Sequence, residues 1–165
     1  MNIPLIPARD FDFSPYGVYY DLVRDPILMR HTHTEAYEDH MTDRPLIDTL
    51  GHLGYTIGAA SPYTVASMEK HDHTQEAIFC MQKPVILCVA ASRGDDAPRA
   101  EDVRAIMLSP GEAVVMNRDV WHDACHGLNE PTGYYWLALS GQSPAIWKSV
   151  DGTAYVKPPE NDPQP

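Results

Sequence analysis

Basic residues are scarce in this chain. Lys and Arg together number 12 against 23 Asp and Glu, which gives a formal net charge of −11. Binding to a phosphate backbone requires clustered Lys and Arg side chains. The charge balance therefore excludes nucleic acid as an expected partner and leaves a small molecule as the expected ligand.

Long hydrophobic runs are also lacking. The longest, residues 84–91 (PVILCVAA), is far shorter than the ~20 apolar residues that a membrane-spanning helix needs. The N-terminal segment MNIPLIPARDF has neither the charged start nor the apolar run of a signal peptide. We therefore expect a soluble, cytoplasmic protein with no membrane partner.

Cysteine is rare and irregularly spaced. The three residues Cys80, Cys88 and Cys125 are an odd number without a CxxC pair, which supports neither a disulfide framework nor a zinc knuckle. Cys80 and Cys88 lie in apolar runs and are expected in the core as reduced thiols. Cys125 lies near two histidines, and a role as a soft ligand or reactive thiol is the alternative to burial there.

The length of 165 residues, 44% of them hydrophobic, suits one domain with a substantial core. We place this domain at residues 1–156. Residues 157–165 (KPPENDPQP) are rich in proline and polar residues, a composition typical of a disordered tail.

Short runs of β-branched and aromatic residues recur between Gly, Pro, Asp and Asn, and they predict an all-β barrel or sandwich. The expected strands are 16–23, 52–59, 63–69, 77–80, 85–91, 104–108, 113–116, 134–140 and 154–156. Residues 45–53 (PLIDTLGHL) have a helix-like spacing interrupted by Gly51. A short helix or an irregular cap is expected there.

The most informative segment is residues 68–77, MEKHDHTQEA. In an extended chain side chains alternate between faces, so Glu69, His71, His73 and Gln75 would share one face. Imidazole nitrogens and a carboxylate oxygen suit Zn²⁺, Mn²⁺, Fe²⁺ or Ni²⁺. Either Glu69 or Glu76 could supply the carboxylate, because Glu76 follows where the strand could bend.

A third imidazole must come from a distant part of the chain. His122 is the best choice, because it follows residues 109–121 (SPGEAVVMNRDVW), in which a Pro-Gly turn leads into a strand and a second turn. The two halves of the site would therefore meet only on folding.

This pair of motifs resembles the cupin superfamily, whose small antiparallel β-barrel, a double-stranded β-helix or jelly roll, holds a metal between the two. Within it the chain is most similar to the ureidoglycolate lyase family. Three stretches carry the likeness: residues 13–21 (FSPYGVYYD), 68–79 (MEKHDHTQEAIF) and 108–122 (LSPGEAVVMNRDVWH).

The resemblance matches Glu69, Lys70 and His71 to the core motif of the family, and Trp121 and His122 to its second motif. His73 and Glu76 depart from the family pattern and make this chain richer in metal ligands. The resemblance and the ligand chemistry together imply a divalent ion (Zn, Ni, Mn or Fe) held by a set of four residues. The expected ligands are His71, His73, Glu76 and His122.

The resemblance further implies a homodimer and a lyase that splits ureidoglycolate, a small carboxylic acid, into glyoxylate and urea. From their chemistry and their nearness to the motifs, Glu69, or Glu76 if it is not a ligand, would be the general base, His126 or a tyrosine the proton donor, and Lys83 or Arg118 the partner of the substrate carboxylate. The departures keep two alternatives open. One is another cupin enzyme, such as a sugar-acid isomerase or an iron dioxygenase, and the other is a non-catalytic binding protein.

A second histidine cluster occupies residues 30–43, RHTHTEAYEDHMTD. It holds His31, His33, Glu35, Glu38 and His40. No strand pattern surrounds the HxH pair, so we expect a solvated polar loop, with a lid over the barrel or a second metal site as alternatives.

Overall fold

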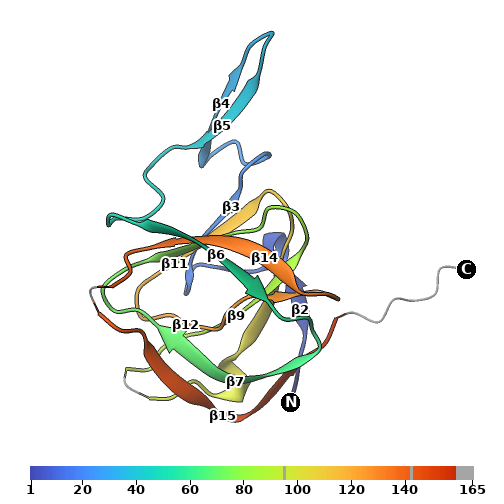
Figure 1. Cartoon of the computed structure of the whole chain (residues 1–165), viewed down its shortest axis with the longest axis vertical. Helices are drawn as coiled ribbons and strands as arrows, with labels where there is room; N and C mark the ends of the chain where they lie inside the picture. Colours follow the sequence, from blue (N-terminus) through green and yellow to red (C-terminus); the bar gives the residue numbers. More distant parts are fainter. Residues whose placement is uncertain (95, 142, 159–165) are drawn as a thin grey trace, which may run out of the picture.

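A computed structural model describes residues 1–94, 96–141 and 143–158. Two β-sheets form the body of the molecule, and a two-stranded hairpin extends from it (Figure 1). The predicted disordered tail falls, from residue 159 on, outside the described residues. That residues 1–156 form one domain remains a prediction.

The larger sheet has eight strands, of which seven follow the order β1-β15-β7-β12-β9-β10-β2, while β13 also pairs with β9. Its strands are β1 (Asn2–Ile3), β2 (Leu5–Pro7), β7 (Tyr63–Lys70), β9 (Val85–Ala90), β10 (Arg104–Leu108), β12 (Trp121–His122), β13 (His126–Gly127) and β15 (Ile146–Val156). Two short 3₁₀ helices, η1 (Ala8–Asp10) and η2 (Ala100–Asp102), are the described helices. Neither is long and apolar enough to cross a membrane.

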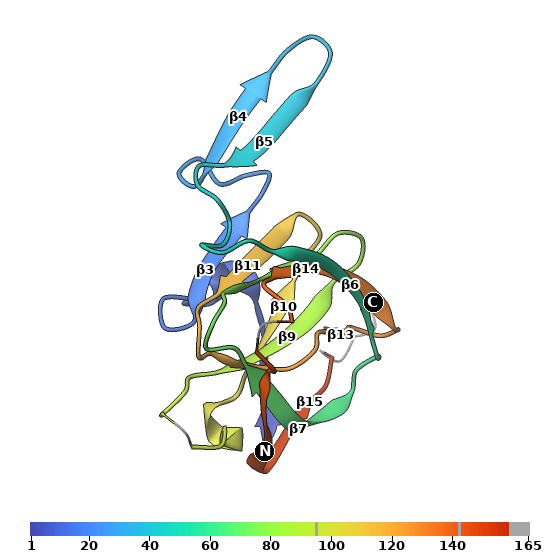
Figure 2. The ribbon, with the colours of Figure 1, turned by 60° about the vertical axis from the view of Figure 1, so that its left-hand side comes forward.

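The smaller sheet has five strands in the order β3-β11-β8-β14-β6. They are β3 (Gly17–Asp21), β6 (His52–Gly58), β8 (Glu76–Phe79), β11 (Glu112–Met116) and β14 (Thr132–Ala138). The two sheets curve toward each other and nearly close into a barrel (Figure 2). The predicted all-β, cupin-type barrel is thus confirmed.

Strand β9 organises the core, because all six of its side chains are buried. Val85, Leu87 and Val89 point into a cluster formed by residues of both sheets. The alternate side chains, Ile86 and Cys88 among them, enter a second cluster that includes Met68 and Trp121. A strand covered on both faces has no solvent side, which explains its unbroken apolar sequence. Cys80, Cys88 and Cys125 are free and buried, as expected for core thiols.

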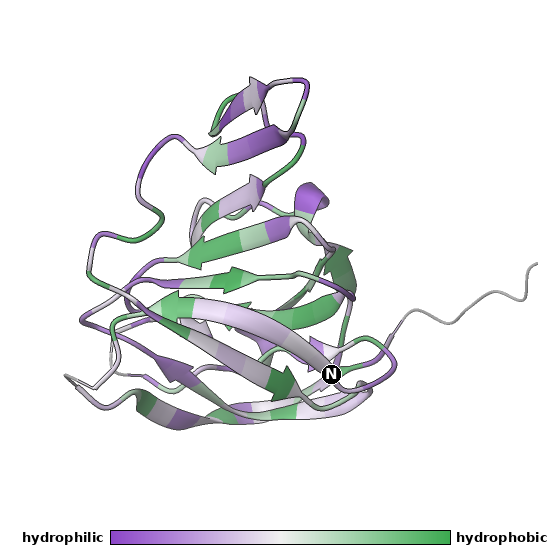
Figure 3. Cartoon of the chain, turned by 45° about the horizontal axis from the view of Figure 1, so that its top comes forward, coloured by the Kyte–Doolittle hydropathy of each residue, from purple (hydrophilic) through white to green (hydrophobic). Residues whose placement is uncertain are grey.

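The hairpin corrects one prediction. Residues that we expected in a polar loop form β4 (Met29–His33) and β5 (Glu38–Thr42), which pair with each other and with no other described strand. The hairpin points away from the barrel, and its strands are drawn mainly in hydrophilic colours (Figure 3). Both of its faces are largely solvent-exposed, so the apolar alternation that reveals a half-buried strand is missing.

The helical alternative for residues 45–53 is also wrong. Bends precede β6, which starts at His52. Strand β15 begins at Ile146, eight positions before the predicted 154. Its first half was missed because it contains Lys148, Ser149 and Asp151 and only intermittent apolar positions.

The burial of β9 leads to a test of the core. Leu87 is fully buried, whereas Leu50 is 89% exposed. Leu87→Ala should reduce the free energy of unfolding by about 2–5 kcal/mol, because it removes apolar contacts and leaves a cavity. The matched change Leu50→Ala should alter it by less than about 0.5 kcal/mol. Urea unfolding of both variants measures the difference, and equal losses would contradict the proposed role of β9.

Candidate active site

The turn between β7 and β8 brings the first motif into position. The predicted alternation holds through Glu69 and Lys70 but is wrong beyond them, because β7 ends at Lys70 and the chain turns before Glu76 opens β8. Lys70 points away from the site, and its Nζ donates a hydrogen bond to Ser92 Oγ at 3.0 Å. The turn is held by the Asp119 amide, which donates to the carbonyl oxygen of His71 at 2.8 Å.

His122 enters the site from strand β12, which lies between β7 and β9 and aligns His122 opposite Glu69. The His122 ring is buried, and its Nδ1 lies 3.0 Å from the carbonyl oxygen of Val120. A carbonyl can only accept, so Nδ1 carries the proton and donates it. Nε2 then faces the site and is buried without a hydrogen bond to any described residue.

Glu76 lies between the two imidazoles. Its Oε2 is 3.0 Å from His71 Nε2 and 3.3 Å from His122 Nε2. Glu69 completes the cluster, with Oε1 4.0 Å from His122 Nε2. The structure therefore brings four of the predicted site residues, Glu69, His71, Glu76 and His122, into one group.

The two carboxylates of this cluster have opposite pKa shifts. Burial favours the protonated form of Glu76, but the adjacent His122 and His71 rings outweigh it and lower the Glu76 pKa to about 2. Burial disfavours a charged His122, yet Glu76 outweighs burial and raises the His122 pKa to about 9. For Glu69, burial is the larger influence and raises the pKa. Glu76 is thus a fixed anion, whereas Glu69 is the stronger base.

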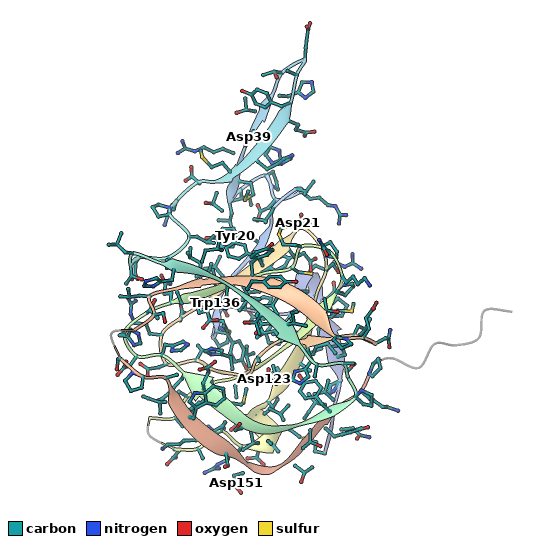
Figure 4. All side chains as sticks on the ribbon, viewed as in Figure 1. Tyr20, Asp21, Asp39, Asp123, Trp136 and Asp151 are labelled. Atoms are coloured by element: carbon teal, nitrogen blue, oxygen red, sulfur yellow. The ribbon has the colours of Figure 1, made fainter. Side chains whose placement is uncertain are left out.

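A pocket of about 620 Å³ opens on this cluster. Glu69, His71, His73 and Glu76 line part of it. The other described lining residues are three aromatic, three hydroxyl-bearing and six small or aliphatic residues. These are Thr56, Ala124, Tyr134, Trp136, Ala138, Leu139, Ser140, Gly141, Ser143, Pro144, Ala145 and Trp147. Trp136 lies within the barrel, above Asp123 in the view of Figure 4.

The walls from β14 were not among the predicted site residues. Tyr134, Trp136 and Ala138 line the pocket from alternate positions of this strand, and Trp136 Nε1 donates to Thr56 Oγ1 at 3.2 Å. The strand itself was predicted, and its alternation was the available signal. It could show that these residues share a face, but not that the face borders a pocket.

His73 lies at the pocket with both ring nitrogens engaged. Its Nε2 is 3.1 Å from the carbonyl oxygen of Leu139, and its Nδ1 is 3.2 Å from Asp72 Oδ1. The ring centroid is 5.9 Å from that of His71. His73 therefore joins the turn to the pocket wall in this arrangement.

The structure does not bring Lys83, Arg118 or His126 to the described pocket lining. Lys83 Nζ pairs with Glu130 at 2.7 Å on the exposed surface. Both terminal nitrogens of Arg118 donate to the carboxylate of Asp48. The His126 ring stacks on Tyr63 with a centroid separation of 3.5 Å.

The cluster fits a divalent metal ion. Glu69, His71 and His122 each offer one ligand atom within 4.8 Å of the other two. The separations of 3.0 and 3.3 Å between Glu76 Oε2 and the two Nε2 atoms are close to the ~3.3 Å between neighbouring ligands of a tetrahedral ion with bonds of about 2.0 Å. The buried Nε2 of His122, which lies 3.3 Å from Glu76 Oε2 and makes no hydrogen bond to a described residue, points the same way.

Comparison with known proteins decides the family. The sequence model named "Ureidoglycolate lyase" matches residues 29–148, more than two thirds of the chain. The chain belongs to the ureidoglycolate lyase family. The match includes both halves of the site, from the β7–β8 turn and from β12. Membership makes the chain a lyase, as the sequence resemblance implied.

Similar proteins of the ureidoglycolate lyase family include three named ureidoglycolate lyase. They come from Escherichia coli O1:K1, Escherichia coli O139:H28 and Shigella boydii serotype 18. Each is 26% identical over 157 residues, covering 91% of this chain and 95% of the relative. The likeness therefore extends over nearly the full length of both proteins.

The Glu76–His122 contact should give the metal-free protein a distinct pH dependence. The His122 pKa is raised from 6.5 to about 9, so its stabilisation is complete below pH 6.5 and lost as the pH rises to about 9. The Glu76 pKa is lowered from 4.5 to about 2, so its stabilisation is complete above pH 4.5 and lost as the pH falls toward 2. The melting temperature of chelator-treated protein should therefore be highest between these windows. Glu76→Gln should abolish the decline above pH 6.5, and an unchanged profile in this variant would refute the assignment.

Proposed function

We propose that this chain splits ureidoglycolate into glyoxylate and urea in the pocket lined by Glu69, His71 and Glu76. The observation that carries the proposal is a pair of carboxylates beside two imidazoles at a pocket, with Glu76 Oε2 3.0 Å from His71 Nε2 and Glu69 Oε1 4.0 Å from His122 Nε2. The opposite pKa shifts of the two carboxylates agree with this geometry. Such pairs divide the roles of proton transfer and charge stabilisation. The names of the relatives support this substrate.

We assign His71, His122 and Glu76 as ligands of a divalent ion. The low pKa of Glu76 keeps it ionised, and the hydrogen bond from His122 Nδ1 to Val120 leaves Nε2 free to coordinate. The bound ion would act as a Lewis acid toward the carboxylate and hydroxyl groups of the substrate. Glu69 lies within reach of the same ion, but its raised pKa suits proton transfer better.

Glu69 performs the proton transfer in this proposal. Its carboxylate takes the proton of the substrate hydroxyl, and the oxygen forms the aldehyde carbonyl of glyoxylate as the carbon–nitrogen bond breaks. The bonding electrons leave with the ureido nitrogen. Glu69, now a carboxylic acid, returns the proton to that nitrogen and releases urea. The step is balanced without an external acid or base, and the raised pKa of Glu69 suits both directions.

The rest of the pocket suits a small polar acid. Among the described lining residues there is no Lys or Arg, so a cation would be the partner for the substrate carboxylate. Thr56, Ser140 and Ser143 offer hydroxyl groups to the ureido end. Trp136 and Trp147 are large apolar walls that exclude water. The exposed or stacked positions of Lys83, Arg118 and His126 give them no part in this proposal.

We also propose that the chain forms a homodimer through strand β6. This strand ends the order of the smaller sheet, and an edge strand invites pairing. Leu53, Tyr55 and Ile57 alternate on its outer face and are 71%, 56% and 66% exposed. Tyr135 of β14 extends this apolar stripe, with its ring 4.9 Å from that of Tyr55. A second copy of the same stripe would cover it.

The activity test is glyoxylate and urea release from ureidoglycolate by the purified protein. Prolonged chelation should abolish release, and a divalent ion should restore it. Glu69→Gln should lower kcat by about 10²–10⁴-fold with a small change in KM, because it removes the base and keeps the pocket shape.

Arg118→Ala is the matched control, because it removes a polar side chain outside the described pocket lining. It should leave kcat and KM unchanged. Absence of glyoxylate release from the metal-loaded wild-type protein would refute the proposed reaction, and full activity of Glu69→Gln would refute the role of that residue alone.

The dimer test is light scattering during size-exclusion chromatography. The wild-type chain should elute as a dimer, and the double variant Leu53→Glu/Ile57→Glu as a monomer, because two carboxylates cannot be buried unpaired. Met81→Glu, at a residue 53% exposed outside the stripe, should leave the dimer intact. A wild-type monomer would contradict the proposal.

A further inference from the structure

The β4–β5 hairpin places four side chains of metal-binding types, three imidazoles and one carboxylate, on one face. His31 is aligned with His40, and His33 with Glu38. Cross-strand partners share a face, and so do residues two apart on one strand. The opposite face carries Thr32 and Asp39, which are aligned with each other. The imidazoles and the carboxylate are thus sorted to one side of the ribbon.

The hydrogen-bond pattern of the hairpin brings these side chains close. The Thr34 amide donates to the Tyr37 carbonyl, and the Asp43 amide donates to the Leu28 carbonyl. Bonded and non-bonded pairs alternate in an antiparallel ladder, so the His31–His40 and His33–Glu38 pairs are non-bonded. Non-bonded pairs have the shorter Cα separation, about 4.5 Å, and the closer side chains.

The side chains are already gathered for coordination. His31, Glu38 and His40 each offer one ligand atom within 4.8 Å of the other two. The His31 and His40 rings meet edge to face with centroids 4.3 Å apart, and His40 Nε2 lies 3.3 Å from Glu38 Oε1. The Nδ1 atom of His40 is buried and has no hydrogen-bond partner among the residues that the structure describes. Small rotations of side chains on an exposed ribbon are sufficient to reach the ~3.3 Å separation around a tetrahedral ion.

We propose that His31, Glu38 and His40 form a second divalent-metal site, separate from the cluster in the barrel. Two imidazoles and one carboxylate favour Zn²⁺ or Ni²⁺ over Mg²⁺ or Ca²⁺, which prefer oxygen ligands alone. His33 lies on the same face and is exposed. The fourth ligand would therefore be His33 or a water molecule. The site belongs to the hairpin alone, since β4 and β5 pair with no strand of the barrel.

The hairpin holds this arrangement through contacts that do not use the ligands. Arg30 Nε donates to Asp43 Oδ1 at 2.7 Å across the base of the hairpin. Thr34 Oγ1 accepts hydrogen bonds from the amides of Ala36 and Tyr37 at the tip. Replacing the ligands therefore leaves the contacts at both ends of the ribbon in place.

The experiment is calorimetric titration of the full chain with Zn²⁺, with the bound metal counted after gel filtration. His31→Ala/His40→Ala should bind one ion fewer than the wild type, because two of three ligands are lost. Glu38→Gln, which keeps the side-chain shape, removes a direct carboxylate ligand and should weaken that same binding step by at least the ~10–100-fold that loss of an outer-shell partner costs. Zn²⁺-induced amide shifts in the NMR spectrum should fall on residues 29–42 in the wild type and vanish there in the double variant.

The control is Thr32→Ala/Asp39→Ala, which alters the opposite face of the same two strands. It should bind as many ions as the wild type, with unchanged affinity. Circular dichroism checks that all variants remain folded. An unchanged stoichiometry and affinity in His31→Ala/His40→Ala would overturn the hairpin site. The same result would leave the proposed lyase reaction untouched, because the barrel residues are intact in every variant.

Discussion

The contact between Glu76 and His122 is the constraint around which the site is built. Glu76 begins a strand of the five-stranded sheet, and His122 lies on a strand of the eight-stranded sheet. Their contact therefore joins the two sheets inside the barrel. Taking ionised groups out of water is costly unless they are paired, so each group holds the other in place. His71, which lies on the turn between the two sheets, contacts the same Glu76 oxygen, Oε2, through its Nε2.

Because of this pairing, the pKa values of the two carboxylates, Glu69 and Glu76, shift in opposite directions. Glu76 is stabilised as an anion by both imidazoles, whereas burial dominates at Glu69 and raises its pKa. One group is thereby suited to bind a cation and the other to exchange a proton. The two functions arise from different surroundings of the same side-chain type. The pocket that opens beside both carboxylates has aromatic residues among its walls.

Several features were predictable from local pattern. The strands with alternating or continuous apolar residues, such as β9 and β10, were predicted within one residue of their observed bounds. The pairing of the 68–77 segment with His122 was expected from the types and order of the residues, and the structure brings them together. The hairpin was missed because an exposed ribbon needs no apolar face. The substrate-binding roles expected for Lys83 and Arg118 rested on nearness in sequence, and both side chains pair with acidic residues outside the described pocket lining.

Composition and residue order predicted an acidic, all-β chain and named Glu69, His71, Glu76 and His122 as residues of interest, and the resemblance of its motifs to known proteins added the cupin type. They could not show which carboxylate would be the anion and which the base, because a pKa depends on burial and on charges brought close by other strands. Nor could they show that His31 and His40 face each other, since that follows from the register of a hairpin with no hydrophobic pattern. In both cases the decisive quantity is a distance between residues far apart in sequence or on separate strands, and only tertiary structure sets such distances.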